Sequence, residues 1–178
     1  MLDINSKLLY NFLIMKYKAN LYYLSIIITI FLFFNCLPKG PEYNFDFPPP
    51  YINARMNEVF PTYIRQQRRV ATKMDLPEGF LGYNVNYLDG DIIMQVIKAP
   101  SEEAVKDYFN NTVVPRFKSM PESSTSETDG WLHATGIEKE GRRWIGWINQ
   151  IWIFQMSGTT EEYFDLVIRA CRFIEKKE

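Results

Sequence analysis

An uncharged apolar run near the N-terminus constrains this chain more than any other feature. Leu21 to Phe34 reads LYYLSIIITIFLFF, with Lys16 and Lys18 just before it. The run is shorter than the roughly 20 residues that cross a bilayer as a helix, and its length is typical of the apolar region of a secretory signal peptide. We therefore predict an export segment over residues 1–35, followed by one domain outside the cytoplasm.

The residues that close this run, LFFNC at positions 32–36, resemble the lipobox of bacterial lipoproteins. In that family a leucine shortly precedes a cysteine that becomes the lipid-carrying first residue. This copy is relaxed, because its leucine lies one position farther from Cys36 than usual and large residues replace the usual small ones. The resemblance covers residues 15–36. It implies a domain anchored by lipid to a membrane of the cell envelope, facing the periplasm or the cell exterior.

Two other interpretations of the N-terminal segment stay open. Residues 21–34 could form an uncleaved membrane anchor, or the ordinary signal peptidase could cleave the chain, although no small-residue site for it is present. All three interpretations place residues 37–178 outside the cytoplasm. Met15 begins a complete signal peptide by itself, so either Met1 or Met15 can be the start.

The charge of the mature chain excludes one class of partner. Residues 1–35 hold three of the 20 basic and one of the 21 acidic side chains, which leaves 17 against 20 and a net charge of −3. Nucleic-acid binding relies on basic side chains that neutralise phosphates. We therefore expect no nucleic-acid partner.

Reactive and metal-binding side chains are scarce. The only cysteines, Cys36 and Cys171, lie in segments of different character, so a disulfide is not expected, and Cys171 falls on the apolar side of a predicted helix. His133 is the single histidine and is predicted to be half-exposed in a strand, which leaves too few groups for a zinc site or a histidine-based catalytic centre. We predict no catalytic residue, no metal and no cofactor, hence no enzyme.

The mature chain is predicted to contain a spacer and one domain. Five prolines follow the lipidated cysteine within residues 36–53 and favour an extended tether. Residues 54–178 are the predicted domain. Its first part, residues 54–67, is either a short helix interrupted at Pro61 or a loop that leads into a strand over residues 68–74.

Hydrophobic periodicity predicts two groups of strands, each followed by a helix. Alternation over residues 83–97 around an Asp-Gly turn indicates a β-hairpin. The spacing of apolar residues after Ser101 indicates a helix that ends or kinks at Pro115. An exposed polar loop over 119–129 then leads to strands at 131–138, 142–148 and 151–156 and to a helix with a capping box at Thr159 and an apolar stripe to Ile174.

The predicted architecture follows from these short connections. Neighbouring strands joined by tight turns must be antiparallel. We therefore predict an α+β domain in which a mostly antiparallel sheet of about five or six strands carries two main helices packed on one face.

Aromatic residues on the last three strands exceed what one buried face needs. Alternation places Trp144 and Gly146 on one face and Trp147 on the other, so both faces are apolar. Two helices on one face would leave the other for residues 42–67, a partner or a lipid-like ligand to cover. The candidate binding surface consists of Trp144, Gly146, Trp147, Trp152, Arg142 and Arg143, with the two arginines as contacts for an anionic group.

These patterns predict a membrane-tethered lipoprotein without enzymatic activity that binds a protein or another envelope component through the aromatic face. Replacing Trp144 or Trp147 would then weaken partner capture while the domain stays folded. The alternative is a module that binds a small molecule or a lipid in a pocket between sheet and helices. That module would be stabilised by its ligand.

Overall fold

The computed structural model describes Tyr23, residues 41–128 and residues 131–177. The chain divides into two compact units, residues 1–40 and residues 41–178. Apart from Tyr23, which is helical, the predicted signal peptide lies outside the described residues, and so does Cys36. None of the described helices is long and apolar enough to span a membrane.

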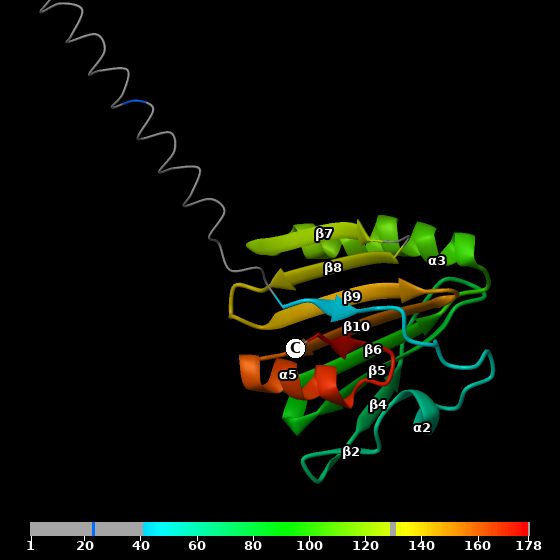
Figure 1. The fold of residues 1–178 in the computed structure, drawn as a ribbon. Helices are drawn as coiled ribbons and strands as arrows, with labels where there is room; N and C mark the ends of the chain where they lie inside the picture. The colour runs from blue at the N-terminus through cyan, green and yellow to red at the C-terminus, as the bar shows by residue number, and fades with distance from the viewer. Residues whose placement is uncertain (1–22, 24–40, 129–130, 178) are drawn as a thin grey trace, which may run out of the picture. The chain divides into compact units, whose positions relative to one another are not determined.

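The second unit is built on a seven-stranded sheet in the order β4-β5-β6-β10-β9-β8-β7 (Figure 1). Every neighbouring pair is antiparallel, which confirms the predicted α+β class with a mostly antiparallel sheet. Pairing of β6 with β10 joins the predicted hairpin to the predicted group of three strands. The strands are β4 (Val70–Lys73), β5 (Leu81–Tyr87), β6 (Ile92–Lys98), β7 (Glu122–Thr128), β8 (Trp131–Ile137), β9 (Arg143–Asn149) and β10 (Trp152–Gly158).

Helices cover both faces of this sheet. On one face α3 (Glu102–Tyr108), the π-helical turn η2 (Phe109–Val113) and α4 (Val114–Lys118) follow one another. On the other face α5 (Glu161–Ala170) packs on the middle strands (Figure 1). The prediction that both main helices share one face was wrong.

Alternation within the two central strands explains this arrangement. Ile97 of β6 and Ile153 of β10 belong to the apolar cluster under α3 and α4, whereas their neighbours Val96 and Phe154 belong to the cluster under α5. Consecutive side chains of a strand point to opposite faces. Two apolar faces therefore require a cover on each side.

Residues between Tyr43 and Ile64 complete the cover beside α5. Phe45 and Phe60 are buried in the same cluster as the apolar side of α5, which confirms that residues 42–67 fold over this face. These residues form β1 (Tyr43–Asn44), α2 (Met56–Val59) and β2 (Tyr63–Ile64), which pairs with β3 (Gln67–Arg68) in a small hairpin. The remaining elements are η1 (Leu88–Gly90) and β11 (Glu175–Lys176).

The predicted spacer, residues 36–53, overlaps the folded domain. The compact unit begins at Pro41, before the boundary predicted at residue 54. Tyr43 and Asn44 pair with the C-terminal strand β11, and Phe45 inserts its ring into the core. The described part of this proline-rich segment, residues 41–53, therefore belongs to the domain and includes the short strand β1.

The helix does not end at Pro115, one of the two predicted outcomes, but continues to Lys118 after a change of helical form just before the proline. In an α-helix the ring of Pro115 would clash with the carbonyl four residues earlier, and the missing N–H would leave that carbonyl unpaired. The preceding turn is π-helical instead, with the Val114 N–H donating to the Phe109 carbonyl. This wider turn accommodates the proline.

Two other predicted boundaries were wrong. The polar stretch 119–129 contains strand β7, an edge strand paired only with β8 among the described strands. The last helix ends at Ala170 instead of running to Ile174, and its N-cap is Thr160, whose hydroxyl accepts from the Tyr163 N–H. The hydroxyl of Thr159, one residue earlier, donates to the Asp91 carboxylate.

Candidate functional site

The tryptophans proposed as a binding surface are buried. Trp144, Trp147 and Trp152 are at most 6% exposed, because a helix or residues 43–64 cover each face of the sheet. Gly146 is buried as well, and the space beside it is filled by the ring of Phe117 from α4. The expected aromatic binding surface was therefore wrong: these residues form the core.

The two arginines of the predicted surface remain partly exposed, but they do not act together. Arg143 faces α5, where it lies 3.7 Å from the Glu161 carboxylate. Arg142 donates to the Gly90 carbonyl (2.9 Å) and to the Ser157 hydroxyl (3.1 Å), which places it near the opposite face. Only Arg142 belongs to the polar group described next.

A row of amide side chains crosses the middle of the sheet on the α4 side. The strand register places Asn84, Gln95 and Gln155 opposite one another on β5, β6 and β10. The Gln95 side-chain amide donates to the Asn84 carbonyl oxygen at 3.2 Å. Gly146 continues the row on β9, and its missing side chain leaves room for α4 to approach.

Arg116 of α4 ends this row. Its Nη1 donates to Gln155 Oε1 at 3.1 Å and to Gln95 Oε1 at 3.4 Å. Its guanidinium lies over the Trp144 ring, 4.0 Å from the ring centroid, a geometry that gives a cation–π interaction. We call Asn84, Gln95, Arg116, Glu138, Arg142 and Gln155 the amide–arginine cluster.

The cluster carries an excess positive charge. Glu138 lies 3.8 Å from Arg116 Nη2 and 3.9 Å from Arg142 Nε, so one carboxylate serves two guanidinium groups. Partial burial lowers the pKa of Arg116, and the charge of Glu138 opposes that effect. A guanidinium stays protonated under such conditions, so the cluster has a net charge of +1.

The cluster also reaches solvent. The side chains of Arg116 and Glu138 are 37% and 33% exposed, whereas Gln155 behind them is buried. Beyond the amides, Asn84 and Asn86 are half-exposed and every residue of β4 is exposed, so this part of the sheet is open. The guanidinium of Arg116 therefore lies at the surface, and the glutamine side chains behind it hold it in place.

The described residues include three further reactive side chains, those of Ser126, His133 and Cys171. Ser126 and His133 are 2.6 Å apart across β7 and β8, but no carboxylate among the described side chains hydrogen-bonds to the histidine, whose pKa is lowered by burial. Cys171 is buried, and burial raises its pKa to about 12, which leaves an unreactive thiol. Within the described part of the chain, no group of three or more potential metal ligands occurs.

Comparison with known proteins adds no assignment. The chain matches no family model, no curated protein and no solved structure. The function must therefore be inferred from the arrangement of its own residues.

Two members of the amide–arginine cluster could have been recognised from the sequence. Gln95 and Gln155 interrupt two otherwise apolar strands, and such polar residues at inward positions mark a polar network. Arg116 could not be assigned to them, because its contact with the glutamines depends on which face of the sheet α4 covers.

Proposed function

We propose that this chain is a membrane-tethered, non-enzymatic binding module of the cell envelope, and that it recognises an acidic group of an envelope component through the amide–arginine cluster. The observation that carries the proposal is the sharing of the Glu138 carboxylate by Arg116 and Arg142 at a solvent-exposed edge of the cluster. Guanidinium groups bind carboxylates and phosphates through charge-assisted hydrogen bonds.

The fixed position of the Arg116 side chain supports a role of the cluster in binding. Arg116 is held from below by Trp144 and from the side by two glutamines, so little conformational freedom is lost when a ligand binds. An exposed, unsupported arginine would lose more side-chain entropy.

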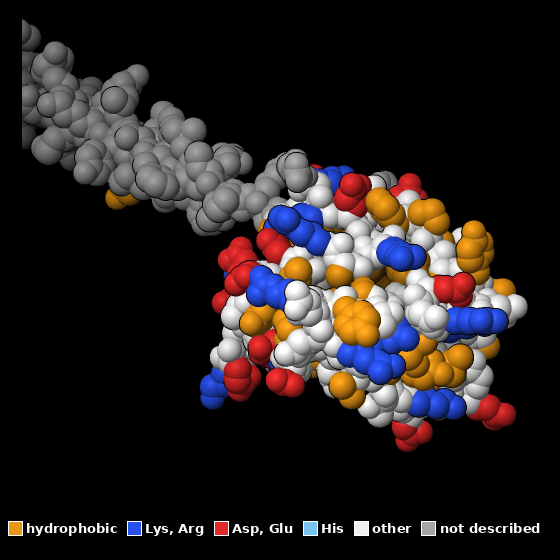
Figure 2. Space-filling model, turned by 90° about the horizontal axis from the view of Figure 1, so that it is seen from below, with side chains coloured by type: hydrophobic (Ala, Val, Ile, Leu, Met, Phe, Trp, Pro, Cys, Tyr) orange, Lys and Arg blue, Asp and Glu red, His pale blue; other side chains and the backbone are white. Residues whose placement is uncertain are grey.

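The alternative, a pocket between sheet and helices, has less support. The apolar hollow between α2 and the sheet, lined by residues such as Met56, Tyr83 and Val96, measures about 40 Å³. Pockets for drug-sized ligands usually measure about 300–1,000 Å³. A larger hollow of about 570 Å³ lies beside β11, but no residue of the seven-stranded sheet lines it, so it is not the predicted pocket between sheet and helices. Figure 2, a view from below, shows hydrophobic side chains in separate patches among charged ones.

Binding is tested with a chain that begins at Pro41, which retains both hydrophobic clusters. We expect calorimetric titration to show binding to polygalacturonate or polyphosphate and none to neutral dextran. Arg116→Gln should weaken that binding about tenfold or more, because a charged hydrogen bond contributes about 1.5–3 kcal/mol. The matched control is Arg68→Gln, which removes an exposed arginine of β3. Unchanged affinity in Arg116→Gln, or equal loss in both variants, would contradict the proposal.

The membrane attachment has its own test. We expect full-length protein expressed in a bacterial host to incorporate labelled palmitate and to partition into detergent, and Cys36→Ala to lose the label. Lipid on the cysteine supplies the several acyl chains that stable anchoring needs. Absence of label in both proteins would remove the lipid anchor, although residues 21–34 would still provide the alternative of an uncleaved helix.

A further inference from the structure

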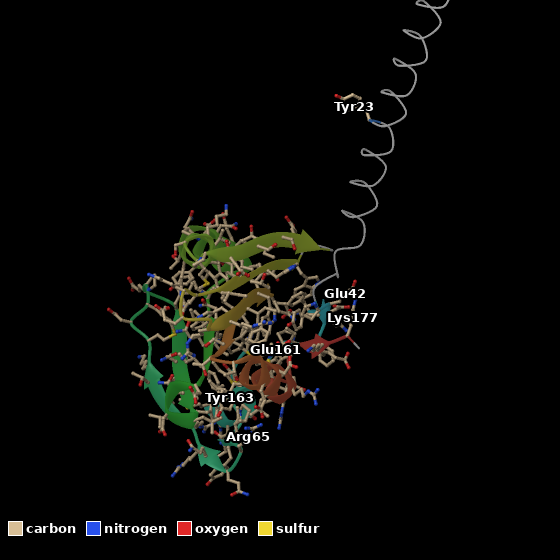
Figure 3. All side chains as sticks on the ribbon, turned by 90° about the vertical axis from the view of Figure 1, so that its left-hand side faces the viewer. Tyr23, Glu42, Arg65, Glu161, Tyr163 and Lys177 are labelled. Atoms are coloured by element: carbon tan, nitrogen blue, oxygen red, sulfur yellow. The ribbon has the colours of Figure 1, made fainter. Side chains whose placement is uncertain are left out.

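The N-terminal end of the domain is fixed to its C-terminal end. Tyr43 pairs with Lys176 and Asn44 with Glu175, and the Lys177 N–H donates to the Glu42 carbonyl at 2.9 Å. Figure 3 shows Glu42 and Lys177 next to each other. The C-terminal strand therefore lies at the point where the chain leaves the domain towards the proposed anchor.

A hollow of about 570 Å³ opens beside this strand. Apolar side chains of Phe47, Ile168 and Ile174 contribute to its lining. Its charged lining residues are Arg169, Glu175, Lys176 and Lys177, a net charge of +2.

The unpaired positive charge of the hollow lies on two of these residues. Lys176 is bound to the Asp165 carboxylate at 2.8 Å, so Arg169, Lys177 and Glu175 together leave a net charge of +1 on the hollow. Arg169 and Lys177 are exposed and form no ion pair with the side chains that the structure describes. A lining that combines apolar side chains with an excess of positive charge complements a group that is both anionic and attached to an apolar body.

The short tether determines which anionic group is within reach. From Cys36 to Pro41 the chain can span at most about 18 Å, at about 3.6 Å per residue. A lipid on Cys36 therefore holds the β1–β11 end of the domain close to the bilayer. The headgroups of neighbouring lipids are the anions present there at high local concentration.

We propose that the hollow beside β11 binds the headgroup of an anionic phospholipid in the membrane that carries the anchor. This inference rests on the proposed membrane attachment and is independent of the amide–arginine cluster. The bound headgroup would orient the domain, with the β1–β11 end towards the membrane.

The test uses the chain that begins at Pro41, so that no anchor contributes to binding. In sedimentation with vesicles, we expect binding to phosphatidylcholine mixed with phosphatidylglycerol and none to phosphatidylcholine alone. The double variant Arg169→Gln/Lys177→Gln should bind about 25-fold more weakly, since each basic residue near an anionic surface contributes about fivefold. Both side chains are exposed, and circular dichroism would verify the fold.

The matched control is Arg68→Gln/Lys73→Gln, which removes the same charge from exposed positions on β3 and β4. We expect this variant to bind vesicles as the parent chain does. Equal loss in the two double variants would show unspecific attraction and overturn the proposal, as would unchanged binding of Arg169→Gln/Lys177→Gln or no vesicle binding by any variant. Arg116→Gln should bind vesicles normally, which separates this test from that of the amide–arginine cluster.

Discussion

The indole of Trp147 is fully buried between two aromatic rings. It stacks on Phe154 with ring centroids 4.9 Å apart and contacts Phe45 at 5.9 Å, while its N–H finds no hydrogen-bond partner. The ring thus contributes apolar packing and leaves one polar atom unsatisfied, which costs free energy. Its role is structural, whereas the sequence predicted a role in binding.

We expect Trp147→Ala to lower the free energy of unfolding by about 3–5 kcal/mol, because it leaves a large cavity in the core. Trp147→Phe should cost clearly less, since it keeps a ring and removes the unpaired N–H. Urea denaturation of the chain that begins at Pro41 measures both. Tyr51→Ala, at a side chain that is 88% exposed, is the control and should leave the midpoint unchanged. A Trp147→Ala variant as stable as the control would restore the idea of a binding residue.

Other single residues were predictable to different degrees. Cys171 is buried and His133 half-exposed, as their positions in apolar and alternating segments indicated. The burial of Trp144 was not predicted, because its surroundings depend on α4, which is distant in the sequence. Long-range packing decides whether an apolar strand residue is core or surface, and a local pattern carries no information about it.

At the scale of elements, β1 contributes more than its two residues suggest. It pairs with β11, and the next residue, Phe45, stacks on His133 with ring centroids 4.7 Å apart. Both contacts lie in the segment that composition had suggested as a free tether. Residues 43–45 are therefore part of the folded domain.

A chain that begins at Phe47 lacks β1 and Phe45. Compared with the chain that begins at Pro41, it should lose about 3 kcal/mol of unfolding free energy or more, the usual effect of deleting a buried phenylalanine side chain. Thermal and urea unfolding measure the difference. If the two chains unfolded at the same midpoint, residues 41–46 would be a passive linker.

Strands and helices with strong periodicity were predicted well, and elements without it were not. The hairpin of β5 and β6 and the strands β8, β9 and β10 fall where alternation and turns placed them. β7 consists of Ser, Thr and Glu, so neither face gives an apolar signal, and only pairing with β8 makes it a strand. Polar edge strands are invisible to hydrophobic periodicity.

On the scale of the whole molecule, one topological fact separates the predicted architecture from the observed one. The chain between β6 and β7 forms α3 and α4, which cover one face of the sheet. The chain after β10 forms α5, which covers the other face. The sequence showed that both sheet faces are apolar, but two covers can be assigned to two faces in several ways. Because helices cover both faces, the aromatic residues are buried and do not form a surface. The amide–arginine cluster lies beside the part of the sheet that stays exposed.

If the chain is tethered to a membrane as proposed, it also bears mechanical load, and the pairing of β1 with β11 determines where the domain would yield first. When a bound partner moves away from the membrane, the pull would enter the domain at Pro41 and act first on β1, which pairs with β11 outside the seven-stranded sheet. Two paired residues and one inserted ring resist far less than the ladders of the seven-stranded sheet. We expect β1 to separate from β11 first, which would lengthen the tether. The seven-stranded sheet would then stay folded and remain bound to the partner.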